Sequence, residues 1–348
     1  MKKQFIKICL LFSFISIYPA LTFSQDQAVE DSAVIIMYHR FGETDFPTTN
    51  VTLEQIDEHI KELSKDIYNI VPLRVITEAF KNGEKLPPRT IAITIDDGYL
   101  SVYEEAWPRF KTASIPFTLF ISTQSVNARN KSSMTWDQIR ELEADPLVDI
   151  GHHSHAHAHM TQMSAESALA DIGFSDAIYQ QELGFIPDMF AFPHGEYSEE
   201  LLEAIKIKNY SAAFAQYSST ANSSNNIMAL PRFAFNQSYA DIDRFKLIIN
   251  SRSLPVRDVL PRSANLEFNP PAAGFTVSEN IKGLKNLECY PSHLKEPANV
   301  NLIGGSRIEI RFDDAFPVGR HRINCTMPGP DGRWYWYGMP FFNFEKTE

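Results

Sequence analysis

Between residues 33 and 250, short apolar runs alternate with stretches in which apolar residues recur at helical spacing. The apolar runs are rich in β-branched and aromatic residues, a pattern typical of strands. They predict strands at 33–39, 69–73, 90–95, 116–122, 147–150, 189–193, 212–216 and 229–233. The stretches between them predict helices at 53–65, 74–83, 100–112, 135–144, 164–183, 198–208 and 241–250.

Strand–helix alternation of this kind indicates a parallel sheet with helices packed outside it. About seven such units favour a closed or nearly closed α/β barrel, and a doubly wound open sheet is the alternative. In both architectures, functional side chains gather at the carboxyl ends of the strands.

The pattern changes after residue 250. Residues 251–271 contain four prolines and no regular period, which predicts a linker. From 272 to 348, strand-like runs are joined by Gly, Pro and Asp turns, so we expect a small antiparallel β domain, a sandwich. The aromatic run 334–337 favours packing in a core or between domains over ligand binding.

The first 24 residues have the composition of a secretory signal peptide. Lys2, Lys3 and Lys7 form a positive segment, and an apolar segment follows over 8–18. An uncleaved membrane anchor is the alternative. We therefore expect an exported bacterial protein, periplasmic or secreted, without a stable membrane span after cleavage of the signal.

The charge balance and the cysteines add two constraints. Residues 1–24 contain three Lys and no acidic residue, so the remainder carries 29 basic and 43 acidic side chains, a net charge of −14. This charge argues against a nucleic acid as partner and suits a neutral or cationic substrate. Cys289 and Cys325 are expected to form a disulfide in an oxidising compartment, with free buried thiols as the alternative.

Several predicted strands end in side chains that can bind a metal ion or transfer a proton. Asp96 and Asp97 follow the strand 90–95, and GHHSHAHAHM at 151–160 follows the strand 147–150. Further side chains of this kind at strand ends are His39, His194 and Arg232. Because the carboxyl ends of parallel neighbours meet on one face, we predict that these groups line one pocket.

Such a mixture of carboxylates and imidazoles suits a hydrolytic metal site. Two imidazoles and one carboxylate on a divalent ion leave positions open for water and substrate, and a second carboxylate can take a proton from that water. Simpler interpretations stay open at this point. The Asp pair could cap the next helix, the alternating histidines could form a solvated patch, and His39 could be structural.

Three segments resemble the motifs of the polysaccharide deacetylases, carbohydrate esterase family four. Residues 94–98 (TIDDG) resemble T-F-D-D-G, residues 153–157 (HSHAH) match H-S-x-x-H, and residues 191–195 (AFPHG) resemble R-x-P-Y-G. The resemblance is nearest to the exported bacterial branch that deacetylates poly-N-acetylglucosamine-like polymers. It implies that residues 25–250 form the distorted (β/α)7-type barrel of that family, a catalytic domain.

The resemblance also implies roles at the matching positions. Asp97, His153 and His157 would bind the metal ion, and Asp96 would be the general base. The backbone N–H of His194 would stabilise the oxyanion. One divalent ion is expected, Zn²⁺ first, with Co²⁺, Ni²⁺ or Fe²⁺ as alternatives.

Two family positions differ in this sequence. The Arg of the third motif is replaced by Ala191, and we expect Arg232 to take its place. The family's late His is absent, because no His occurs between residues 195 and 292, and we expect His39 to serve as the general acid. A structural hydrogen bond is the alternative for His39.

Three further residues are expected to contact substrate: Tyr99, Trp136 and His159. For Trp136, a place in the core is an equal alternative. The predicted function is metal-dependent removal of acetyl from N-acetylated amino sugars in a polysaccharide or oligosaccharide. The alternatives are a peptidoglycan, chitin-oligomer or cyclic-amide substrate, a glycan-binding protein without catalysis, and a His-rich metal carrier.

Overall fold

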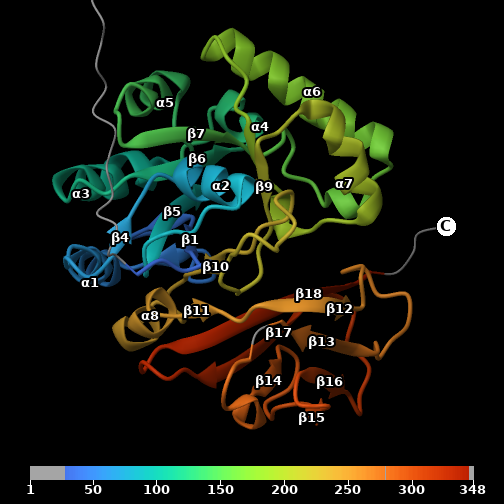
Figure 1. Cartoon of the computed structure of the whole chain (residues 1–348). Helices are drawn as coiled ribbons and strands as arrows, with labels where there is room; N and C mark the ends of the chain where they lie inside the picture. Colours follow the sequence, from blue (N-terminus) through green and yellow to red (C-terminus); the bar gives the residue numbers. More distant parts are fainter. Residues whose placement is uncertain (1–27, 279, 345–348) are drawn as a thin grey trace, which may run out of the picture.

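The structure is a computed structural model that describes residues 28–278 and 280–344. The predicted signal peptide, 1–24, lies outside the described residues. An α/β barrel lies above an all-β part in the view of Figure 1. No helix in the described ranges is long and apolar enough to cross a bilayer.

A curled sheet of eight parallel strands forms the barrel wall, in the order β10-β1-β5-β6-β7-β8-β9 with β4 paired to β5. The strands are β1 (Val34–Tyr38), β4 (Asn69–Ile70), β5 (Thr90–Asp96), β6 (Phe117–Ile121), β7 (Val148–His152), β8 (Met189–Ala191), β9 (Ala212–Phe214) and β10 (Phe233–Ala234). Leu230 bridges to Phe214 of β9, and Phe233 pairs with Ile36 of β1, so this segment nearly closes the ring. The predicted barrel is confirmed, and the open sheet is excluded.

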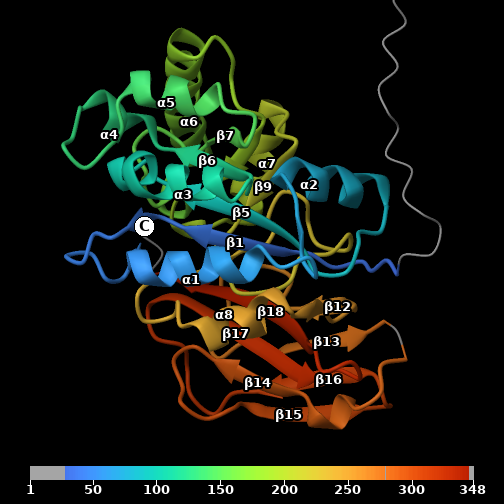
Figure 2. The same cartoon turned by 90° about the vertical axis from the view of Figure 1, so that its left-hand side faces the viewer.

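Helices surround this sheet (Figures 1 and 2). They are α1 (Leu53–Leu63), α2 (Leu73–Asn82), α3 (Trp107–Thr112), α4 (Thr123–Asn127), α5 (Trp136–Glu143), α6 (Ala165–Glu182), α7 (Glu199–Ile205) and α8 (Ile242–Ile249). Thr52 and Thr135 form capping boxes at the start of α1 and α5, and Ser164 caps α6. These side chains satisfy backbone N–H groups that a helix start leaves without partners.

The structure differs from the predicted helix at 100–112. Residues Val102–Ala106 form a π-helical turn, and α3 begins only at Trp107. Pro108 has no N–H to donate to the carbonyl four residues earlier, so the α-helical ladder is interrupted there. The short parallel pair β2 (Arg40–Phe41) and β3 (Asn50–Val51) was not predicted.

The barrel core explains why its central strands are apolar throughout. Every residue of β1 and β5 is buried. One face of each strand points into the barrel and the other packs under helices, so both faces exclude water. Close packing also requires Gly151 in β7, because an added Cβ would lie 2.2 Å from the ring of Phe120.

The C-terminal part consists of two four-stranded sheets, β11-β18-β17-β14 and β12-β13-β16-β15. The strands are β11 (Arg252–Ser253), β12 (Val256–Leu260), β13 (Ala273–Val277), β14 (Glu288–Pro291), β15 (Asn299–Ile303), β16 (Arg307–Arg311), β17 (Gly319–Pro328) and β18 (Trp334–Asn343). Cys289 of β14 and Cys325 of β17 are paired in register and form the expected disulfide.

The interval predicted as a linker, 251–271, contains β11 and β12. β11 pairs with β18, and β12 pairs with β13, so residues 252–260 belong to the β domain. The prediction of a linker is wrong for these residues. Pro255 between the two strands gave the segment the composition of a linker, and the partner of β11, the strand β18, lies far along the sequence.

The β domain packs directly on the barrel through β18 (Figure 2). Trp336 packs against Phe233 of the barrel, and its carbonyl accepts a hydrogen bond from Thr220 at 2.7 Å. Tyr335 and Tyr337 belong to the core of the β domain. Three residues of the aromatic run therefore have the packing role that was favoured from the sequence, whereas Trp334 is 37% exposed.

Candidate active site

Asp97, His153 and His157 converge at the carboxyl ends of β5 and β7. One ligand atom from each residue lies within 4.8 Å of those of the other two. The Nε2 atoms of His157 and His153 lie 3.1 and 3.4 Å from Oδ1 of Asp97. Three residues selected from two separate motifs thus meet at one point.

The loops that present these ligands are held in unusual backbone conformations. Asp97 and His157 have positive φ values of 78° and 52°. Such conformations carry strain for residues other than Gly and persist only where the surroundings enforce them. Asp171 of α6 helps to hold the loop 153–159 in place, because its carboxylate accepts hydrogen bonds from the N–H groups of His155 (2.9 Å) and Ala156 (3.0 Å).

The donor atoms fit a divalent cation. Nδ1 of His153 donates to the carbonyl of Ala191 at 2.7 Å, which leaves the Nε2 lone pair facing the centre. Oδ1 of Asp97 is buried without a hydrogen-bond partner among the described residues. Burial alone would raise the pKa of Asp97, but the neighbouring imidazoles hold it well below its usual range. An ionised, buried carboxylate and two imidazoles, once these are deprotonated at Nε2, form a donor set that Zn²⁺ and similar ions accept.

Asp96 is paired with Arg232 in the barrel interior. Nη1 and Nη2 of Arg232 donate to the two Asp96 oxygens at 2.7 and 2.8 Å. Burial alone would raise the pKa of Asp96, but the Arg232 charge holds it below its usual value. Asp96 is therefore ionised at neutral pH and can accept a proton.

Arg232 reaches this position by a route that differs from the prediction. It does not end a strand but precedes β10, where the chain crosses from β9 to β1. Its Nε also donates to the carbonyl of Ala215 at 3.0 Å. Arg232 thus approaches Asp96 from the start of β10 and not from the carboxyl end of a strand.

His39 follows β1 and lies near both Asp96 and Asp97, whose charges act on it. Burial is the main cause that lowers the pKa of His39, so its ring is neutral at neutral pH.

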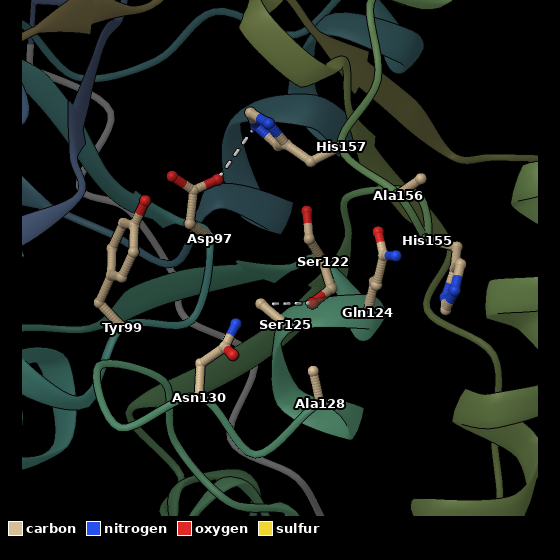
Figure 3. A pocket seen from close by; sticks show the side chains of 10 residues that line it. All are labelled: Asp97, Tyr99, Ser122, Gln124, Ser125, Ala128, Asn130, His155, Ala156 and His157. Atoms are coloured by element: carbon tan, nitrogen blue, oxygen red, sulfur yellow. Dashed lines mark hydrogen bonds and ion pairs between the residues drawn. The ribbon is translucent and has the colours of Figure 1, made fainter.

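A cavity of about 310 Å³ opens beside Asp97 and His157 (Figure 3). Besides these two, its polar lining residues are Tyr99, Ser122, Gln124, Ser125, Asn130 and His155. Tyr99 stacks on the guanidinium of Arg40, whose carbon lies 3.5 Å from the ring centroid. A small polar group bound here would therefore reach the metal-ligand cluster.

The remaining predicted residues lie in different places. Trp136 packs against the barrel core, donates to Asn127 at 2.8 Å and is not among the residues that line the cavity, so its substrate role is not supported. His159 lies beside His194, with stacked rings 3.9 Å apart. His152 is fully buried and contacts Asp176 at 3.1 Å, away from the centre.

His194 forms a tight turn after β8. Its φ is 58°, and Gly195 follows with a φ of 70°. Burial, followed by nearby positive groups, lowers the pKa of His194 to about 3, so the ring is neutral. Glu196 comes next, with a carboxylate that is fully buried and accepts from Nδ1 of His159 at 2.9 Å.

Sequence reasoning missed Glu196, Asp171 and the cavity residues after β6. Ser122 is the last residue of the predicted strand 116–122, so the same strand-end argument could have found it. Glu196 and Asp171 lie in or next to helical segments and carried no such signal.

A curled α/β barrel with carboxylates and imidazoles at its strand ends is an arrangement found in many hydrolases. The sequence supports a family match: residues 83–213 match the family described as polysaccharide deacetylase. Members of this family are hydrolases that act on acetamide carbon–nitrogen bonds.

Known relatives agree with this assignment. A poly-β-1,6-N-acetyl-D-glucosamine N-deacetylase of Staphylococcus aureus is 24% identical over 228 residues, which are 58% of this chain and 78% of the relative. The deacetylase PplD of Streptococcus pyogenes, solved with acetate, has a TM-score of 0.58 and 18% identity and covers 63% of this chain and 98% of its own. IcaB of Ammonifex degensii has a TM-score of 0.53 and 20% identity over 64% of this chain and 98% of its own. The two structural likenesses establish the fold.

Proposed function

We propose that this chain is a metal-dependent N-deacetylase that hydrolyses the acetamide of N-acetylated amino sugars in a glycan. The observation that carries the proposal is the pairing of an ionised, buried Asp96 with a cluster of three ligand atoms at the same strand ends. A base and a cation site side by side are what hydrolysis of an unreactive amide requires.

Asp97, His153 and His157 would hold the ion. When bound, a divalent cation supplies Lewis acidity to the acetyl carbonyl and to the attacking water. Zn²⁺ is the proposed ion, because two imidazoles and a carboxylate are among its common ligand sets.

The chain's own residues would move the protons. Asp96 would take a proton from the attacking water, and Arg232 would hold Asp96 in place and ionised. The backbone N–H of His194 would donate to the oxyanion. The protonated form of His39 would deliver a proton to the departing amine; because burial lowers the His39 pKa, this form is scarce at neutral pH but is a strong acid. The products would be acetate and a free amino sugar.

The substrate assignment rests on the relatives and on charge. The Staphylococcus aureus relative is named for poly-β-1,6-N-acetyl-D-glucosamine, so that polymer is the first substrate to test. The proposed product is cationic at neutral pH, and a chain with a net charge of −11 does not repel it. Tyr99 and His155 line the cavity and would contact the sugar.

Export, with residues 1–24 as signal peptide, is part of this proposal. It is supported by the composition of that segment and by the disulfide in the β domain. Residues 25–250 would be the catalytic unit, and the β domain would start at β11 rather than at residue 272.

The test is acetate release from poly-β-1,6-N-acetylglucosamine oligomers by the purified chain, with chelator and with Zn²⁺ or Co²⁺ added back. We expect release that chelator abolishes and metal restores. Chitin and peptidoglycan oligomers are assayed in parallel to identify the preferred glycan. Binding of oligomers without acetate release under any metal condition would instead indicate a glycan-binding protein.

A further inference from the structure

The β domain reaches the candidate active site through one side chain, Arg320 of β17. Its Nη1 donates to the carbonyl of His194 at 2.6 Å. Its Nε lies 3.5 Å from the carboxylate of Glu196. One guanidinium from the C-terminal domain thus contacts both sides of the turn that carries His194.

This turn needs external support. His194 has a left-handed backbone conformation, which is strained for a residue with a Cβ. Gly195 lies so close to the next strand segment that an added Cβ would be 2.3 Å from the backbone N of Gln216. The turn therefore cannot relax toward the barrel, and Arg320 restrains it from the opposite, β-domain side.

Glu196 connects Arg320 to the metal-ligand cluster. Its buried carboxylate accepts from Nδ1 of His159 at 2.9 Å and from Thr161 at 3.1 Å. The ring of His159 stacks on that of His194, whose centroid lies 4.5 Å from that of the ligand His157. A continuous series of contacts leads from the β domain to the ion site.

We propose that Arg320 is a positioning residue, and that the β domain is therefore a functional part of the active site. The hydrogen bond to the His194 carbonyl holds the peptide plane between His194 and Gly195, and the contact with Glu196 holds the residue after it. Together the two contacts restrain the turn that presents the His194 N–H. This role rests on the proposed function, in which that N–H stabilises the oxyanion. A donor that is held in advance stabilises the transition state without reorganisation at the moment of reaction.

The test compares Arg320→Ala and Arg320→Lys with the wild-type chain. Arg311→Ala is the matched control, because Arg311 lies in the same domain, is half exposed and pairs with Glu309 on the surface. For each variant, kcat, KM and metal stoichiometry are measured with the full chain. Hydrogen exchange of the amides of residues 192–197 is followed by mass spectrometry without substrate or metal, so this readout does not depend on turnover.

For Arg320→Ala we expect kcat to fall about 10- to 100-fold, with KM within about twofold of wild type. Metal stoichiometry should be unchanged, and exchange should accelerate in residues 192–197 without a similar change elsewhere. Arg320→Lys keeps the charge but not the two-point contact, so its kcat and exchange should be intermediate. Arg311→Ala should match wild type.

Two results would overturn the inference. Wild-type kcat and wild-type exchange in Arg320→Ala would show that the turn needs no support from the β domain. Faster exchange across both domains, with a lowered melting temperature in Arg320→Lys as well, would make Arg320 an ordinary interdomain contact. If the wild-type chain releases no acetate, the proposed function fails, and locally accelerated exchange in Arg320→Ala would still support the positioning of the turn.

Discussion

Replacing Arg232 by Met should destabilise the barrel by removing the partner of a buried charge. The side chains of Arg232 and Asp96 are 0% and 2% exposed and share two hydrogen bonds of 2.7 and 2.8 Å. Removing one partner of such a pair leaves the other charge buried without compensation, which costs roughly 3–5 kcal/mol of unfolding free energy. Met fills a similar volume, so a cavity contributes little to the loss.

The loss of unfolding free energy in Arg232→Met should increase as the pH rises. Burial alone would raise the pKa of Asp96, and in the wild-type chain Arg232 outweighs burial and lowers it. The pair thus stabilises the fold above the unfolded-state pKa of about 3.9, and this stability is lost as the pH falls through the depressed value. In Arg232→Met burial, the largest influence on the Asp96 pKa, is no longer opposed by Arg232, so Asp96 folds protonated at low pH and the loss of unfolding free energy grows as the pH rises toward neutral.

The assay is urea unfolding of the metal-free wild-type and variant chains at pH 5 and pH 8. Arg311→Met is the control, because its ion pair is partly exposed and should contribute less than about 1 kcal/mol. A variant as stable as wild type at pH 8, or a difference that shrinks as the pH rises, would refute this account of the pair.

Three further predictions follow from single contacts. Burial lowers the pKa of His59 to about 4, so the stability that the neutral ring provides above pH 6.5 is lost as the pH falls from about 6.5 to 4. In His59→Gln, the unfolding free energy measured in urea should therefore vary less with pH over that window, by up to about 3 kcal/mol. The same pH dependence as in the wild-type chain would contradict this. Gly195→Ala should lower the unfolding free energy by roughly 2–4 kcal/mol, because the added Cβ meets the backbone of Gln216. Gly83 has a similar φ but open space around it, so Gly83→Ala should lower the unfolding free energy by only about 1–2 kcal/mol. Equal losses in thermal unfolding would argue against the close approach at Gly195. His157→Ala should weaken Zn²⁺ binding at least about 10-fold by calorimetry, and wild-type affinity would remove His157 from the ligand set.

The fold was predictable to the extent that its signals were local. The alternation of strands and helices identified the barrel because the spacing of apolar residues is a property of each element alone, as in α1 with its cap at Thr52. The strand β11 was missed because its partner β18 lies near the end of the chain, and β12 was missed because the prolines on both sides of it, Pro255 and Pro261, resembled a linker signal. Pairing between distant segments leaves no periodicity in either one.

The site was predictable where residues follow strands. Asp97, His153 and His157 meet as expected. The strand-end argument predicted that the Asp pair and the His cluster share a pocket, and the resemblance to the family motif selected these two histidines from the cluster. The bond between Arg232 and Asp96 was also expected, although Arg232 approaches from the start of a strand. Arg320 carried no sequence signal, because its contact with the His194 turn depends on how two domains pack.

The most direct test of the proposed mechanism is a comparison of Asp96→Asn with the wild-type chain for acetate release and Zn²⁺ binding on the same preparation. Asp137→Asn is the control, since its side chain is 88% exposed on the surface. We predict that Asp96→Asn binds one Zn²⁺ like wild type but loses about 10²- to 10⁴-fold in kcat, the usual contribution of a general base. Undiminished turnover in Asp96→Asn, with the ion bound, would contradict the assignment of Asp96 as the base.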